Sequence, residues 1–170
     1  MFQIHVRTSI NGDDTEFSCE PDETLLDVLR EKVGTKSPKI GCERGDCGTC
    51  TILMDGRTVR SCLVLAVEAD GHEITTVEGI SYAGMSELQD LFISNNSFQC
   101  GFCAPGIVLS ATELLAHNPS PTRHDVQEAL AGNLCRCTGY QHIVEAVKLA
   151  APVTLISSPA SKVSPVPSGL

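Results

Sequence analysis

The nine cysteines are the residues of this 170-residue chain whose type and spacing could do chemistry. Eight of them fall into two sets of four, within residues 42–62 and residues 100–137. Thiolate sulfur binds zinc and iron–sulfur clusters strongly, so this grouping favours metal binding. The ninth cysteine, Cys19, lies outside both sets, and we expect it to be a small core or surface thiol.

The first set has the spacing C-x4-C-x2-C-x11-C and consists of Cys42, Cys47, Cys50 and Cys62. Its short spacings agree with the plant-type [2Fe–2S] pattern, C-x4-C-x2-C…C. Gly41, Gly45 and Gly48 would permit the sharp turn and the close approach of backbone N–H groups to sulfur that such a loop needs. Structural zinc is the alternative, but zinc sites usually use paired C-x2-C motifs, and only one such pair is present here.

The second set has the spacing C-x2-C-x31-C-x-C and consists of Cys100, Cys103, Cys135 and Cys137. Spacing alone indicates a four-thiolate metal site and leaves a second [2Fe–2S] cluster and zinc both open. A thioredoxin-like redox pair would need a βαβ setting, whereas the flanking sequence favours helices. Helix N-termini favour anionic thiolates, which suits cysteines placed at helix ends.

The elements that must position these cysteines differ between the two halves of the chain. The first half predicts strands at residues 2–9 and 15–19 around the turn Asn11-Gly12, and a helix from about Thr24 to Gly34. Further short strands are expected at residues 51–54, 57–60, 63–67 and 74–77. The second half predicts four helices, over residues 86–94, 105–117, 122–131 and 140–150. We therefore expect an α+β chain with domains at 1–80 and 81–151 and a Pro/Ser-rich tail at 152–170.

Charge and hydropathy exclude several other classes of protein. The formal net charge of −9 disfavours nucleic acid as a partner, because binding it needs a basic footprint. We find no apolar run of 18 residues for a transmembrane segment and no basic, then apolar, start typical of a secretory signal. The expected location is cytoplasmic, where disulfides are rare, so a disulfide framework is disfavoured. No nucleophile–base pair stands out, and we predict no catalytic residue on this chain.

Three segments carry a resemblance to a known family: GCERGDCGTCT at 41–51, QCGFCAPG at 99–106 and GNLCRCTGY at 132–140. Together they closely resemble the small iron–sulfur subunit of the xanthine-oxidase family of molybdenum hydroxylases, over about residues 1–151. The resemblance implies a β-grasp, plant-type ferredoxin-like domain followed by a four-helix domain, with one [2Fe–2S] cluster in each. One departure is Ala104, where family members often have threonine, which removes a hydroxyl but no ligand.

The resemblance also implies partners and a direction of electron flow. Electrons would pass from a molybdopterin, expected in its cytosine dinucleotide form in a large subunit, through the second cluster and then the first. They would leave to FAD in a medium subunit, within a dimer of heterotrimers. Matching positions suggest that Gln99 and Cys137 lie against the pterin, although Gln99 could simply cap a turn. Phe102 is expected to shield the second cluster from water.

An N-heteroaromatic compound such as quinoline is the substrate class that the resemblance favours for the whole complex. Carbon monoxide, an aldehyde or a purine is the alternative substrate. Two hypotheses of other classes remain: a freestanding two-cluster ferredoxin, and a zinc-binding interaction module.

Overall fold

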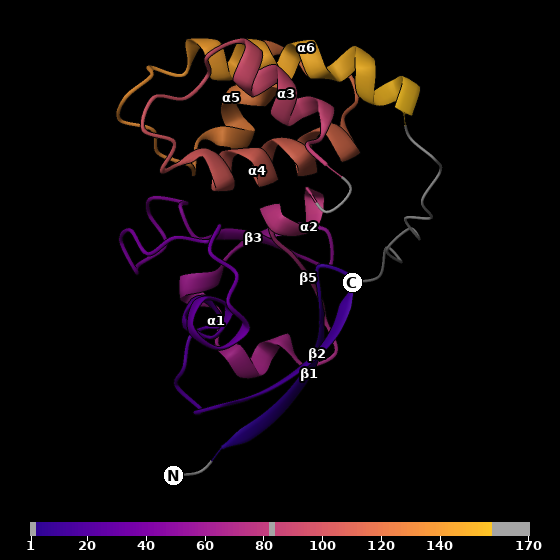
Figure 1. Ribbon diagram of the computed structural model, residues 1–170. Coiled ribbons are helices and arrows are strands. Elements are labelled where there is room, and N and C mark those ends of the chain that lie inside the picture. Colours follow the sequence, from indigo (N-terminus) through magenta and orange to yellow (C-terminus); the bar gives the residue numbers. More distant parts are fainter. Residues whose placement is uncertain (1–2, 82–83, 158–170) are drawn as a thin grey trace, which may run out of the picture.

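The computed structural model describes residues 3–81 and 84–157. A strand-rich half with the N-terminus and a helical half are stacked on each other, as Figure 1 shows. The sheet lies in the first half and the long helices lie in the second, which confirms the expected α+β class.

The chain begins with a hairpin whose turn is dictated locally. Strands β1 (Ile4–Ile10) and β2 (Asp13–Cys19) pair antiparallel, with Ile4 opposite Cys19. Asn11 and Gly12 adopt φ angles of 57° and 90°. Positive φ at both central positions is what a type I′ turn requires, so the Asn-Gly signal is confirmed. Phe2, expected to start the strand, lies outside the described residues.

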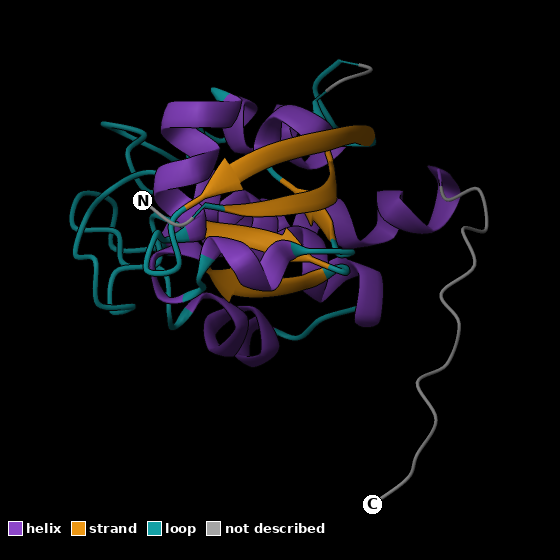
Figure 2. Cartoon of the chain, turned by 90° about the horizontal axis from the view of Figure 1, so that it is seen from below, coloured by secondary structure: helices purple, strands orange, loops and turns teal. Residues whose placement is uncertain are grey.

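Five strands form one sheet in the order β2-β1-β5-β3-β4. Strands β3 (Thr51–Met54) and β4 (Arg57–Arg60) form a second hairpin, and β5 (Glu73–Thr75) pairs parallel with β1 and antiparallel with β3. Figure 2 shows the strands from below. A parallel pair at the centre of an otherwise antiparallel sheet is the arrangement expected of a β-grasp domain.

One helical segment, together with Ala66 and Ala69, provides the side chains that cover the sheet. Thr24 accepts a hydrogen bond from the Asp27 backbone N–H, and the chain continues as α1 (Leu25–Asp27) and the π-helical η1 (Val28–Val33). Gly34 ends the segment at φ 91°, as the sequence predicts. The buried core between segment and sheet consists of Val6, Ile10, Phe17, Cys19, Leu25, Val28, Leu29, Ile52, Ala66, Ala69 and Ile74.

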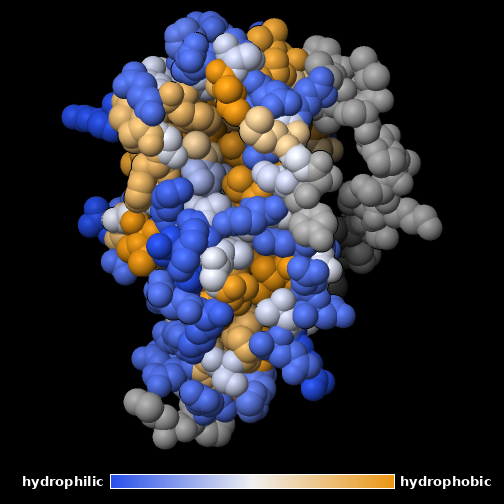
Figure 3. All heavy atoms as spheres, in the orientation of Figure 1, coloured by the Kyte–Doolittle hydropathy of each residue, from blue (hydrophilic) through white to orange (hydrophobic). Residues whose placement is uncertain are grey.

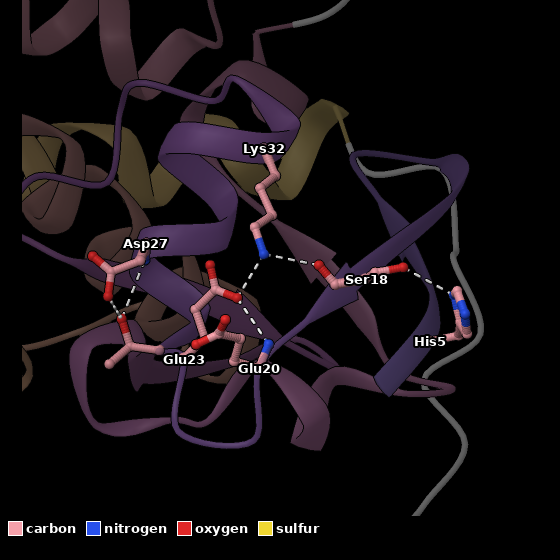
Figure 4. A network of polar contacts seen from close by, with 7 residues as sticks. His5, Ser18, Glu20, Glu23, Asp27 and Lys32 are labelled. Atoms are coloured by element: carbon pink, nitrogen blue, oxygen red, sulfur yellow. Dashed lines mark hydrogen bonds and ion pairs between the residues drawn. The ribbon is translucent and has the colours of Figure 1, made fainter. Parts of the chain in front are cut away.

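A polar network fixes η1 to the end of β2. Lys32 lies 2.6 Å from a carboxylate oxygen of Glu23 and donates to the carbonyl of Ser18 at 2.8 Å. The same carboxylate oxygen accepts the backbone N–H of Glu20 (Figure 4). The network ties the helical segment to the strand that precedes it.

Two expectations for the first half are wrong. Residues 63–67 form no strand; the chain there makes two short 3-10 helices, η2 (Ser61–Leu63) and η3 (Ala66–Ala69). The backbone of this segment bonds to the start of α1 instead of a sheet neighbour, since Leu25 N–H donates to the Val64 carbonyl. Val77, expected to end a strand, begins the one-turn helix α2 (Val77–Ile80).

The second half is a bundle with the expected helix starts. Its helices are α3 (Glu87–Ser94), α4 (Ala104–His117), α5 (Arg123–Leu130) and α6 (Gln141–Ser157). Capping boxes at Ser86 and Thr122 begin α3 and α5. The expected end of α6 at residue 150 is wrong, because a proline removes one hydrogen bond without necessarily ending a helix. Residues 152–157, expected to begin the tail, therefore belong to α6, and residues 158–170 lie outside the described residues.

The two halves have separate apolar cores. The core of the bundle is built from α3, α4, α5 and α6 and shares no residue with the core under the sheet. Apolar side chains also reach the surface among hydrophilic ones in both halves, as Figure 3 shows. Within the described ranges, no helix combines the length and the hydropathy needed to cross a membrane.

Candidate metal centres

Three cysteines of the first set, Cys42, Cys47 and Cys50, lie on an irregular loop between η1 and β3. Gly45 and Gly48 have φ angles of 86° and 73°, and the non-glycine Glu43 also has a positive φ, 54°. A Cβ on Gly41 would lie 2.8 Å from the Cys47 sulfur. Gly41 is therefore required for close approach to the Cys47 sulfur, and Gly45 and Gly48 are required for their positive φ angles.

The four thiols of this set form an outer and an inner pair. Cys42 and Cys47 are half-buried, and the Cys47 backbone N–H donates to the Cys42 sulfur at 3.4 Å. Cys50 and Cys62 are buried, with 2% and 8% of their surface exposed, and they interact directly. The spacing thus brings together all four residues that the sequence predicts, with Cys62 delivered by η2.

The environments of Cys42 and Cys62 shift their thiol pKa values in opposite directions. Backbone N–H groups of Arg44 and Cys47 lower the pKa of Cys42 to about 7. Burial, followed by the neighbouring Cys50 thiol, raises the pKa of Cys62 to about 11. A buried thiol pair without a cation resists ionisation, and a bound metal supplies the positive charge that reverses this. The backbone thus prepares Cys42 for the thiolate form, whereas the buried Cys62 needs the charge of a metal.

The second set joins two turns of the bundle. Cys103 is the residue that precedes α4, and Cys135 and Cys137 lie between α5 and α6. The sulfurs of Cys100 and Cys137 lie 3.6 Å apart, and both residues are exposed. Cys103, only 7% exposed, interacts with Cys135 in the interior. This set therefore also consists of an outer and an inner pair.

Each pair of the second set combines one thiol with a raised pKa and one with a lowered pKa. In the outer pair, the neighbouring Cys100 thiol raises the pKa of Cys137. Burial and then the neighbouring Cys135 raise the pKa of Cys103 to about 12. The Phe102 backbone N–H lowers the pKa of the outer Cys100. Burial would raise the pKa of Cys135, but the Thr138 hydroxyl, 3.1 Å from its sulfur, and nearby backbone N–H groups lower it overall.

This donor chemistry fits a two-iron cluster better than a single ion. In the described part of the chain, no three histidine, cysteine or acidic side chains converge closely enough to hold one metal ion. Each set instead offers two pairs of thiols, and backbone N–H groups donate to the outer sulfurs. A cluster with two irons uses four thiolates and is tuned by hydrogen bonds to its sulfurs.

Gln99 and Cys137, the two residues expected against a pterin, lie together on the surface. The Gln99 side-chain amide donates to the Cys137 carbonyl at 3.2 Å, and both residues are exposed. Phe102 is 46% exposed, and the Lys39 ammonium lies 5.8 Å from the centre of its ring. The outer side of the second set is thus an accessible surface of mixed polarity.

Cys19 lies apart from both sets. Its side chain is fully buried in the core under the sheet, at the end of β2. Burial is the main cause that raises its pKa. Of the two expected positions, core or surface, the structure places it in the core.

Sequence reasoning missed the residues that hold the two ligand sets against each other. Asn133 is 1% exposed and bonds to the first ligand loop; it lies in the segment 132–140 that carries the resemblance, but the sequence assigns it no role there. Arg60 donates to the Gly132 carbonyl, and the Tyr140 hydroxyl accepts the Cys135 backbone N–H. Their partners are distant along the chain or lie on the backbone, so no spacing motif could have indicated them.

Comparison with known proteins gives matches over both halves. Residues 8–77 match the family described as "2Fe-2S iron-sulfur cluster binding domain", and residues 76–148 match the "[2Fe-2S] binding domain" family. The chain is 53% identical over 145 residues to the nicotine 6-hydroxylase small subunit of Paenarthrobacter nicotinovorans, covering 85% of this chain and 88% of that one. It is 44% identical over 151 residues to the nicotinate dehydrogenase small FeS subunit of Eubacterium barkeri, covering 88% and 96%.

A solved structure agrees with these sequence matches. A chain of quinoline 2-oxidoreductase from Pseudomonas putida 86 is 48% identical and superimposes with a TM-score of 0.84. The match covers 89% of this chain and 97% of that one. The similarity therefore extends over both cysteine sets and over the way in which the two halves are stacked.

Proposed function

The chain belongs to the [2Fe–2S] small subunits of the xanthine-oxidase family of molybdenum hydroxylases, and on this premise we propose that its eight paired cysteines hold two clusters in series. It is an electron-transfer subunit of a multisubunit oxidoreductase. When bound, each [2Fe–2S] cluster supplies reversible one-electron reduction. The arrangement of each set as an outer and an inner thiol pair is the observation that carries the ligand assignment.

We propose that each pair binds one iron. In the first set, Cys42 and Cys47 would hold the outer iron, and Cys50 and Cys62 the inner one. In the second set, Cys100 and Cys137 would hold the outer iron, and Cys103 and Cys135 the inner one. The direct interactions within the pairs support this partition. We place the boundary between the two cluster-binding domains near residue 80.

The exposed outer pair of the second set favours a partner at that surface. We propose that Gln99 and Cys137 contact a molybdopterin, in its cytosine dinucleotide form, in a large subunit. Electrons would enter there and leave through the first set to FAD in a medium subunit. A dimer of heterotrimers in the cytoplasm is the assembly that we propose.

The substrate of the whole complex is proposed to be an N-heteroaromatic compound. The relatives named for nicotine, nicotinate and quinoline support this class, because they match over nearly the full chain. No residue of this subunit has a substrate-binding role in the proposal; substrate choice lies in the large subunit.

The test is anaerobic purification of the complex from its source, followed by metal analysis and EPR. We expect about four irons and four sulfides per copy of this chain, two distinct rhombic EPR signals after reduction, and two larger chains in the mass spectrum. A colourless, EPR-silent chain with stoichiometric zinc would overturn the cluster assignment. A stable monomer with both clusters and no partner would instead support the freestanding ferredoxin.

The proposed role of Gln99 is tested in the same complex with Gln99→Ala. Both EPR signals should persist, while reduction of the second cluster by substrate slows. Gln127→Ala removes another exposed amide, on α5, and serves as the matched control. Equal substrate reduction rates in the two variants would contradict a role of Gln99 at the pterin.

A further inference from the structure

A single buried amide lies where the two halves of the chain meet. The Asn133 side chain donates to the Gly48 carbonyl at 3.1 Å and to the Thr51 hydroxyl at 3.2 Å. Its carbonyl oxygen accepts the Ser110 hydroxyl at 2.9 Å. One side chain thus bonds the first ligand loop, strand β3 and helix α4 together, with 1% of its surface exposed.

The residues on either side of Asn133 extend this connection. Arg60, which also donates to Thr51, donates to the Gly132 carbonyl at 2.8 Å. The Leu134 backbone N–H donates to the Cys47 carbonyl at 2.9 Å. The next residue is the ligand Cys135, so the segment 132–135 passes directly from the first ligand loop into the second ligand set.

Close backbone approach makes this junction sensitive to small shifts. A Cβ on Gly48 would lie 2.3 Å from the Gly132 carbonyl oxygen, and a Cβ on Gly106 would lie 2.3 Å from the Gly48 carbonyl oxygen. The first ligand loop therefore lies directly against helix α4 and the segment 132–135. Among the described residues, the two buried cores have no residue in common, but Val77 and Ile80 of α2 pack against the core of the bundle.

Polar pairing adds the directional precision that apolar contact alone does not give. A buried amide with all its bonds made fixes its partners in one geometry, and removing it leaves buried donors and acceptors unsatisfied. Loss of Asn133 would leave the Ser110 hydroxyl without this partner. The Gly48 carbonyl would lose the bond from Asn133, in the segment between α5 and α6, and keep only its bonds from the nearby Thr51.

We propose that Asn133 is a positioning residue that fixes the two ligand sets relative to each other and thereby sets the rate of electron transfer between them. The inference rests on the proposed function, because it assumes that both sets hold clusters. Each transfer oxidises one iron by one electron and reduces another by one, with no bond or proton exchanged. Asn133 takes no part in that exchange and acts only through the loops that it joins.

The test uses the full complex with Asn133→Ala and compares it with Glu113→Ala. Glu113 accepts the Thr58 backbone N–H at 3.0 Å, so it also joins α4 to β4, but away from the ligand loops. Three measurements are made on each variant: iron content, the EPR spin–spin splitting between reduced clusters, and hydrogen exchange of the Leu134 amide. One-electron pulse reduction then gives the rate of transfer between the clusters.

Asn133→Ala should keep about four irons per chain and accelerate Leu134 amide exchange. It should change the spin–spin splitting and slow transfer severalfold, because electron tunnelling weakens steeply as the distance between the clusters increases. Glu113→Ala should leave the splitting and the rate unchanged. Unchanged splitting, exchange and rate in Asn133→Ala would overturn the proposal.

A second variant keeps the proposal testable if the complex with Asn133→Ala does not assemble. Ser110→Ala keeps the amide and removes only the hydroxyl bonded to its carbonyl oxygen. It should change the splitting and the rate in the same direction but less, and no change in either would overturn the proposal. Absence of clusters from the unsubstituted complex would instead contradict the proposed function, so the two failures are distinguishable.

Discussion

The backbone N–H of Leu134 donates a 2.9 Å hydrogen bond to the carbonyl oxygen of Cys47. Cys47 belongs to the first ligand set, and Leu134 directly precedes Cys135 of the second. One hydrogen bond and a short stretch of backbone therefore connect the two sets. A change on one side of this bond should be detectable at the other side as well.

The partition of the ligands predicts selective loss of signals. Cys47→Ser should abolish the EPR signal of the first cluster and leave the second, whereas Cys135→Ser should do the reverse. Cys19→Ala is the control, because it removes a buried thiol outside both sets and should retain both signals. Retention of both signals in either ligand variant would show that the partition is wrong.

Gly48 should tolerate alanine much less than Gly56 does. Both have positive φ, 73° and 77°, so both substitutions strain the backbone equally. The Cβ at position 56 has nothing within 4 Å, but the Cβ at position 48 meets the Gly132 carbonyl oxygen at 2.3 Å. Gly48→Ala should lower the free energy of unfolding by about 1–3 kcal/mol more than Gly56→Ala, measured by denaturant titration. Equal losses would contradict the close contact of the loops.

Glu78 should make stability depend on pH in the acid range. Burial alone would raise its pKa, but hydrogen bonds from Ser37 and Thr76 lower it from 4.5 to about 2. A carboxylate with a lowered folded-state pKa stabilises the fold above its unfolded pKa, and that contribution is lost as pH falls from about 4.5 towards 2. Because the residue is exposed, screening limits the effect to about 1 kcal/mol or less.

The matched variant is Glu78→Gln, which keeps the shape of the side chain but does not titrate. The unfolding free energies of the two proteins should differ at pH 6 and converge as the pH falls below the ordinary value of 4.5. Chemical denaturation at a series of pH values measures this. A difference that stays constant down to pH 3 would show that the bonds to Glu78 do not depend on its charge.

Locally encoded features of the fold were predictable from sequence. Asn11-Gly12 specifies its hairpin, and the capping boxes at Ser86 and Thr122 specify two helix starts, because partner and signal lie within a few residues. The 3-10 segment around Val64 was not predictable in this way. Its apolar run resembles a strand, but its backbone bonds to residues 23–25 at the start of α1 and not to a neighbouring strand of the sheet.

The candidate ligands were predictable from the sequence for a related reason. The residues that hold the ligand loops in place were not. Thiolates from one loop need fixed short spacings, so the first set is visible in the sequence as a pattern. The bond from Asn133 to Gly48 joins residues 85 positions apart and depends on how the two halves are stacked. Asparagine after glycine at a helix end reads simply as a stop, and nothing local indicates its buried partners.

Tyr140 should protect the second ligand set specifically. Its hydroxyl accepts the Cys135 backbone N–H at 2.7 Å and donates to the Asn133 carbonyl at 2.9 Å, so it holds the segment between them. Tyr140→Phe leaves both groups unpaired, which should cost about 1–2 kcal/mol of unfolding free energy. The loosened segment should release iron from the second cluster sooner than from the first. EPR spectra recorded during incubation with a chelator measure the loss of each signal.

Thr112→Val is the control for that experiment. It removes a hydroxyl that bonds to the Val108 carbonyl at 2.8 Å within α4, in the same half of the chain but without contact to a ligand loop. Its second-cluster signal should decay at the unsubstituted rate. Equal decay of the two signals in Tyr140→Phe would mean that the hydroxyl stabilises the bundle as a whole and has no specific effect on the segment that carries Cys135.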